Sequence, residues 1–157
     1  MCKPSNLQYS NILLFCKSLK KSVNILVILI TKNTTNNIIL TLAEKTTLTN
    51  AVYLFEVTND SSEVVKCFIA EDISPNKQRY NEFDLIENAT EDLLNGTFEL
   101  GLSGFYTYNI YEQTSTTNLD TTLATNLIET GKLNVVSTIA ELEKYNGNQT
   151  ETVVYNG

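Results

Sequence analysis

The fold is decided by the stretch Val52-Tyr-Leu-Phe-Glu-Val-Thr58, Asn59-Asp-Ser-Ser62 and Val64-Val-Lys-Cys-Phe-Ile-Ala70. Its two outer runs are rich in β-branched and aromatic residues, and the middle piece has turn composition. Successive side chains of a strand point to opposite faces, so Tyr53, Phe55 and Val57 would share one face. The stretch therefore predicts a β-hairpin with one buried face.

Similar runs recur along the chain, with polar turn residues between them. They are Ile25–Thr31, Ile38–Leu42, Tyr80–Ile86, Thr97–Leu100, Phe105–Glu112 and Leu133–Val136. Short strands at regular spacing predict an all-β fold, an antiparallel β-sandwich of about 7–8 short strands. Phe105–Glu112 has bulky side chains on both faces, so we expect it to be central or covered by a partner subunit. Thr152–Tyr155 is expected to add a last edge strand.

One short helix is expected within the sandwich. Asn118-Leu-Asp120 could cap a helix over Thr121–Thr130, and Gly131 would end it in the left-handed conformation. Leu123, Leu127 and Ile128 would then lie on one side, although the threonine content makes such a helix dependent on tertiary contacts.

The charge distribution separates a basic start from an acidic body. Residues 1–43 contain five lysines and no acidic residue, whereas residues 44–157 hold six basic and eighteen acidic residues. We predict a basic apolar N-terminal arm or leader over 1–33 and a single β-sandwich domain over 34–157. Ile25–Ile30 would be a buried strand or an extended arm that pairs with a neighbour. The acidic body argues against nucleic-acid binding, and no apolar run reaches the roughly 20 residues that a membrane span needs.

Residue types that carry catalysis are scarce. The chain has no histidine, and its three cysteines, Cys2, Cys16 and Cys67, lack metal-ligand spacing. We expect no enzyme activity, no cofactor and no metal, and Cys67 should pack as a small apolar residue. Glu82 and Asp84 would project from the same face of a strand, so they could bind calcium or act as a glycosidase pair. Solvated surface carboxylates are the alternative for this pair.

Docking surfaces are the better candidates for functional residues. The possible interface consists of Tyr106, Tyr108 and Tyr111 in the aromatic run and of Ile25, Val27 and Leu29 near the start. Tyrosine is favoured at interfaces because its apolar ring carries a polar end. Sandwich core plus subunit contact is one interpretation of the tyrosines, and sugar binding by stacked aromatic rings is the other.

Several segments follow one another in a familiar order from Leu40 onward. They include Leu40-Thr-Leu-Ala-Glu-Lys-Thr-Thr-Leu-Thr-Asn50, Tyr53-Leu-Phe-Glu-Val-Thr-Asn-Asp60, Arg79-Tyr-Asn-Glu-Phe83, Gly104-Phe-Tyr-Thr-Tyr-Asn-Ile-Tyr-Glu-Gln113, Asn118-Leu-Asp120, Leu127-Ile-Glu-Thr-Gly-Lys-Leu133 and the terminal Val153-Val-Tyr-Asn-Gly157. This order resembles small β-sandwich virion structural proteins of tailed phages infecting Bacteroidota, the crAss-like and related phages. The basic residues 1–33 depart from that pattern.

The resemblance implies a non-enzymatic virion structural or accessory protein, capsid-associated or in the head–tail region, that acts by subunit docking. Its partners would be other virion proteins, such as major capsid or head-tail proteins, together with copies of itself, and its location would be the virion. The alternative is a carbohydrate-binding or adhesion β-sandwich module, and a glycosidase using Glu82 and Asp84 is a third hypothesis.

Overall fold

The hairpin predicted from the sequence forms in the structure. The computed structural model describes residues 27–137, in which β3 (Val52–Asn59) pairs antiparallel with β4 (Val65–Ala70). The register places Phe55 opposite Phe68 and Tyr53 opposite Ala70, and all four side chains are buried. The alternation of side chains along β3 therefore directs one of its faces into the core, as expected.

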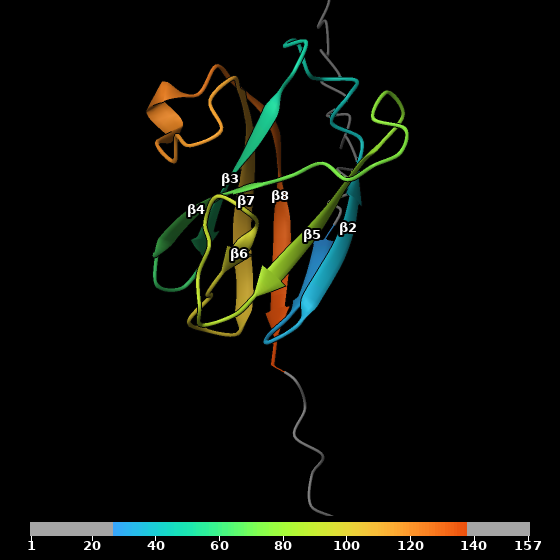
Figure 1. The fold of residues 1–157 in the computed structure, drawn as a ribbon. Helices are drawn as coiled ribbons and strands as arrows, with labels where there is room; N and C mark the ends of the chain where they lie inside the picture. The colour runs from blue at the N-terminus through green and yellow to red at the C-terminus, as the bar shows by residue number, and fades with distance from the viewer. Residues whose placement is uncertain (1–26, 138–157) are drawn as a thin grey trace, which may run out of the picture.

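Eight strands form two sheets in the described residues (Figure 1). The other six are β1 (Val27–Thr31), β2 (Thr35–Leu40), β5 (Asn81–Glu87), β6 (Thr97–Phe98), β7 (Gly104–Gln113) and β8 (Asn126–Val136). One sheet has the order β1-β8-β7-β3-β4 and the other has the order β2-β5-β6. Four of the six strand pairs are antiparallel, whereas β1–β8 and β5–β6 are parallel. The all-β sandwich is confirmed.

Aromatic rings from both sheets fill the centre of the sandwich. Phe55 and Phe68 of the five-stranded sheet stack with centroids 5.3 Å apart, and Phe68 stacks on Phe98 of the other sheet at 4.0 Å. Phe83 completes the cluster with its edge against Phe55 at 5.2 Å. All four are almost completely buried, so the burial of these rings contributes to holding the two sheets together.

The helix predicted over Thr121–Thr130 is wrong. Only a short 3-10 helix, η1 (Thr121–Leu123), forms, with the Asp120 carboxylate accepting the backbone N–H of Thr122 as its cap. β8 then runs through Gly131, directly opposite Tyr108 on β7. A Cβ at Gly131 would collide with the Tyr108 ring and its hydroxyl oxygen, so glycine makes room for the ring here and does not end a helix. Pairing with β7 outweighs the weak helical preference of this threonine-rich segment.

The predicted boundary between an arm and a domain is also corrected. β1 lies within the predicted arm, yet it pairs in parallel with β8 and places Ile28 and Ile30 in the core. The sandwich therefore already includes Val27, and position 33 falls in the tight turn between β1 and β2, where Asn33 has a φ of 57°. The predicted strand Thr152–Tyr155 lies outside the described residues.

Candidate functional site

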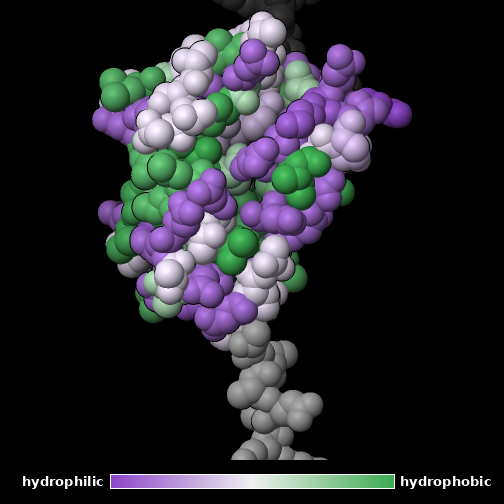
Figure 2. Space-filling view, in the orientation of Figure 1, coloured by the Kyte–Doolittle hydropathy of each residue, from purple (hydrophilic) through white to green (hydrophobic). Residues whose placement is uncertain are grey.

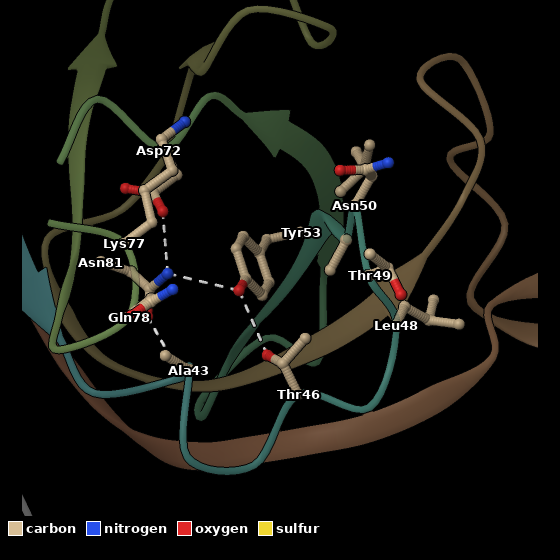
Figure 3. A pocket seen from close by; sticks show the side chains of 12 residues that line it. Ala43, Thr46, Leu48, Thr49, Asn50, Tyr53, Asp72, Lys77, Gln78 and Asn81 are labelled. Carbon is tan, nitrogen blue, oxygen red and sulfur yellow. Dashed lines mark hydrogen bonds between the residues drawn. The ribbon is translucent and has the colours of Figure 1, made fainter. Parts of the chain in front are cut away.

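An open cleft lies at the end of the sandwich where β3 begins. Its volume is about 750 Å³, and it is bordered by the loop that leads into β3 and the loop that joins β4 to β5 (Figure 3). The residues that line it are Ala43, Thr46, Leu48, Thr49, Asn50, Ala51, Val52, Tyr53, Asp72, Lys77, Gln78 and Asn81. An adjoining hollow of about 500 Å³ shares Tyr53 and Asp72 and extends to Ile69 and Thr116. We call the first of these the end cleft.

A buried asparagine organises the floor of the end cleft. The Asn81 side-chain oxygen accepts the backbone N–H groups of Leu42 and Ala43, at 2.9 and 3.0 Å. Its amide nitrogen donates to an Asp72 carboxylate oxygen at 2.8 Å and to the Tyr53 hydroxyl at 3.3 Å (Figure 3). Asn81 is thus a cross-link between the two loops and β3, which explains why an amide is buried at the start of β5.

Asp72 has a similar structural role. One of its carboxylate oxygens accepts the backbone N–H groups of Ser74 and Glu82, both at 3.0 Å, so it holds the loop between β4 and β5 in place. Asn81 and Asp72, the deepest polar side chains of the end cleft, are therefore engaged in hydrogen bonds that hold its two bordering loops in place. Asn50, Lys77 and Gln78, farther out on the lining, are the side chains best placed to meet a polar ligand.

Glu112 on β7 is fully buried and organises a second loop attachment. One oxygen accepts the backbone N–H groups of Thr47 and Leu48, at 2.8 and 3.1 Å, and the other accepts the Thr47 hydroxyl and the Asn126 amide, at 2.6 and 2.8 Å. Burial by itself would raise the pKa of Glu112, but these hydrogen bonds lower the pKa to about 2. The ionised carboxylate is a structural anchor for the loop before β3.

Glu87 performs the same task at the opposite end of the sandwich. Its two carboxylate oxygens accept the backbone N–H groups of Asn33, at 2.7 Å, and of Leu100, at 3.1 Å. The side chain is almost completely buried, and it connects the β1–β2 turn with the segment after β6. Both oxygens of each of these buried carboxylates thus accept hydrogen bonds from the protein itself.

The carboxylate pair singled out from the sequence lies on a different surface. Glu82 and Asp84 do point to the same face of β5, away from the core, and the amide of Asn37 on β2 donates to both, at 3.0 and 2.9 Å. Neither residue lines the end cleft or the adjoining hollow. Within residues 27–137, no group of three or more ligating side chains is placed to hold a metal ion.

Two of the predicted interface tyrosines are in the core. Tyr106 and Tyr108 are only 3% and 2% exposed, because the even-numbered residues of β7 face the opposite sheet. Their rings pack in the core and do not lie on the outer face, which corrects the prediction for both. Tyr111 lies on the outer face of β7 and is half-buried, and Ile25 lies outside the described residues.

Val27 and Leu29, in contrast, are available for docking. They are 48% and 57% exposed, since Ile28 and Ile30 take the inward positions of β1. Phe105 on β7 is also 57% exposed, and the strand register places Leu29, Asn134 and Phe105 in one row across β1, β8 and β7. We call Val27, Leu29 and Phe105 the outer patch. Sequence reasoning missed Phe105, although its odd position in the β7 alternation with Tyr106 placed it on the opposite face.

Another part of the outer face of the five-stranded sheet is covered. Leu54 on β3 and Ile69 on β4 point away from the core cluster, yet they are buried. The loop of residues 114–125 lies beside this part of the sheet (Figure 1), and its Thr116 lines the same hollow as Ile69. The apolar side chains of Leu54 and Ile69 are therefore protected, whereas the outer patch, Val65 and Leu127 are left open on this face.

Similarity to known proteins does not identify the role of the end cleft or of the outer patch. The described part of the chain contains no helix with the length and apolar character that a membrane crossing requires. Comparison with known proteins found no matching family model, no matching curated protein and no matching solved structure.

Proposed function

We propose that this chain is a non-enzymatic bacteriophage virion structural or accessory protein, capsid-associated or in the head–tail region, that acts by subunit docking. The observation that carries the docking role is the outer patch. Its three apolar side chains are about half exposed, whereas Leu54 and Ile69 on the same face are buried. Apolar groups clustered on a surface favour protein–protein contact, because association removes them from water. The virion setting comes from the sequence resemblance.

The polar groups of the molecule support a structural role as well. The buried carboxylates Glu87 and Glu112 and the cleft carboxylate Asp72 accept backbone N–H groups of loops. A general acid or base needs a proton-transfer group directed at a substrate, whereas these groups are directed at the backbone. A rigid sandwich with ordered loops and an open apolar patch suits repeated docking between subunits.

Substitution in the outer patch tests the docking role. Leu29→Asp should shift the full-length chain from oligomer to monomer in light scattering across a concentration series, because an ionised carboxylate cannot be buried in an apolar contact. Ile39→Asp is the matched control, since Ile39 is 58% exposed on the other sheet and lies outside the patch. Equal oligomer populations in Leu29→Asp and Ile39→Asp would reject the patch as the docking surface.

Mass spectrometry of purified particles tests the virion assignment separately. We expect the chain in the particles of a phage whose genome encodes it, at a copy number comparable with other repeated shell components. A monomeric chain that is absent from such particles would contradict the proposal in full.

The end cleft favours a second candidate function, a carbohydrate-binding or adhesion module. Its volume of about 750 Å³ and its side chains Asn50, Lys77 and Gln78 suit hydroxyl-rich ligands. Its aromatic residue, Tyr53, is almost buried and bonds Thr46 and Asn81, so it does not offer a stacking surface. A glycan array that shows binding by the wild type and its loss in Gln78→Ala would favour this function over the first.

A further inference from the structure

The outer edge of β4 presents backbone groups without a strand beside them in the described residues. The N–H of Asn59 bonds the carbonyl oxygen of Val64 at 3.0 Å, so even-numbered positions of this strand point toward β3. The N–H of Ile69 instead bonds the carbonyl oxygen of Leu93 at 2.7 Å, on the side away from β3. Because antiparallel pairing alternates, the N–H groups of Val65 and Cys67 point away from β3 as well.

An apolar groove runs beside this edge. It has a volume of about 210 Å³, and its lining combines the apolar side chains of Val64, Leu100, Leu102 and Tyr106 with the charged Lys66 and Glu99. Val64, Val65 and Leu102 are exposed, and Figure 2 shows hydrophobic side chains gathered on the side of the molecule formed by β4. An exposed apolar edge strand invites pairing with another strand, and proteins normally cover such edges.

The described part of the chain ends next to this groove. The hydroxyl oxygen of Ser137, its last residue, is 3.1 Å from that of Ser103, and Ser103 follows Leu102 of the groove. The fourteen residues 138–151 can span up to about 46 Å when extended, which is longer than the sandwich edge formed by the six residues of β4. The C-terminal segment therefore starts close to the groove and is long enough to reach any part of the β4 edge.

We propose that Thr152–Tyr155 of the same chain adds to the free edge of β4 as a further strand. Its sequence, Thr-Val-Val-Tyr, consists of strongly strand-favouring residues. Alternation places Val153 and Tyr155 on one face and Thr152 and Val154 on the other. We assign the more apolar pair, Val153 and Tyr155, to the face over the groove. Tethering favours the chain's own segment over that of a second copy, because a short connection gives a high effective concentration. The added strand at the β4 edge requires neither the virion role nor docking through the outer patch.

Amide hydrogen exchange in the full-length protein tests the added strand. The amides of Val65 and Cys67 should be protected, and Val153→Asp should lower their protection by about tenfold or more. A carboxylate is disfavoured there, because most of the lining is apolar and the Lys66 ammonium in it already pairs with Glu91. Thr152→Asp is the matched control, since it adds the same charge on the face that points away from the groove, and it should retain the protection. The amides of Lys66 and Phe68, which bond β3, should be unaffected in both variants and report that the sandwich is intact.

Three results would overturn the inference. The first is free exchange of the Val65 and Cys67 amides in the wild type, and the second is equal protection in the two variants. The third is protection confined to a species with the mass of a dimer, which would assign the strand to a second copy. The two proposals have separate readouts. Val153→Asp should change the exchange of the Val65 amide without changing the oligomeric state, whereas Leu29→Asp should change the oligomeric state.

Discussion

Several buried polar side chains of this protein hold its loops in place through hydrogen bonds. Asn81, Glu87 and Glu112 each accept two backbone N–H groups from segments far away in the sequence. A buried acceptor that is fully hydrogen-bonded avoids the penalty of desolvation and fixes the position of its partners. This use of side chains explains how long loops at both ends of the sandwich keep a defined shape.

Glu112 makes the stability of the folded protein depend on pH in the acid range. Its pKa is about 2 in the folded protein and 4.5 ordinarily, so the folded state favours the ionised form. This contribution is complete above pH 4.5 and is lost as the pH falls toward 2. The free energy of unfolding of the wild type should therefore fall between pH 4.5 and pH 2. We expect this fall to be smaller by about 1–3 kcal/mol in Glu112→Gln, which is typical of hydrogen bonds to a charged group.

Urea unfolding of wild type and Glu112→Gln at a series of pH values measures this effect. The two curves of stability against pH should converge as the pH approaches 2, because the wild-type carboxylate is then increasingly protonated. Parallel curves would show that another group produces the acid dependence.

At the scale of elements, the loop between β7 and β8 decides which part of the outer face is closed. Gln113 anchors it, because its amide nitrogen donates to the carbonyl oxygens of Ser115 and Asn118 at 2.9 and 3.0 Å. Asn118 returns a hydrogen bond to the Gln113 side-chain oxygen at 2.8 Å. Cys67 on β4 is half-buried, and burial, followed by the charges of Glu56 and of Asp120 in this loop, raises the pKa of its thiol.

Loosening this loop should expose the thiol of Cys67. We expect Gln113→Ala to increase the rate of Cys67 alkylation several-fold, because loss of the anchor admits water and favours the reactive thiolate. Peptide mapping by mass spectrometry separates Cys67 from Cys2 and Cys16. Thr117→Ala is the control within the same loop, since the hydrogen bond at Thr117 uses its backbone N–H and survives the substitution. Equal rates in the two variants would contradict the covering role of the loop.

At the scale of the whole molecule, the two sheets depend on one shared core. The rings of Phe55, Phe68 and Phe98 connect β3, β4 and β6 in a continuous stack that crosses between the sheets. A sandwich with one core is expected to lose both sheets together, because neither sheet can bury its apolar face alone.

Phe68→Ala should therefore destabilise the whole sandwich by about 4 kcal/mol, through the lost burial and the cavity that remains. Denaturant unfolding followed by far-UV circular dichroism and by tyrosine fluorescence should give coincident transitions for the wild type. Leu123→Ala is the control, because it removes an apolar side chain that is 72% exposed and lies outside the outer patch, and the expected cost is below about 0.5 kcal/mol. Similar costs for both variants would contradict the assignment of the core.

Much of the fold was predictable because its signals are local. The runs that became β3, β4 and β5 combine strand-favouring residues with polar turns, and the structure confirms each of them within a few positions. The β8 segment was misassigned in part, since Thr121–Thr130 has a possible cap and a glycine after it but no neighbour visible in the sequence. Its strand pairing depends on β7, which contributes hydrogen bonds that no local pattern records.

The candidate sites were less predictable, for a geometric reason. Val27 and Leu29 could be named from their apolar character, and the structure places them on an exposed face. The end cleft could not be found, because Asn81 and Asp72 are brought together with Tyr53 only when three separate segments meet. Hydrogen bonds over such sequence distances leave no periodic signal.

The sequence by itself determined that this chain forms strands, that the hairpin of β3 and β4 has one buried face, and that catalytic residue types are scarce. Only the tertiary structure decided that Tyr106 and Tyr108 fill the core while Phe105 faces outward. Both faces of that strand carry bulky side chains, so alternation separates the two sets without saying which is buried. The choice depends on which face the second sheet covers, and that is a property of the packed molecule.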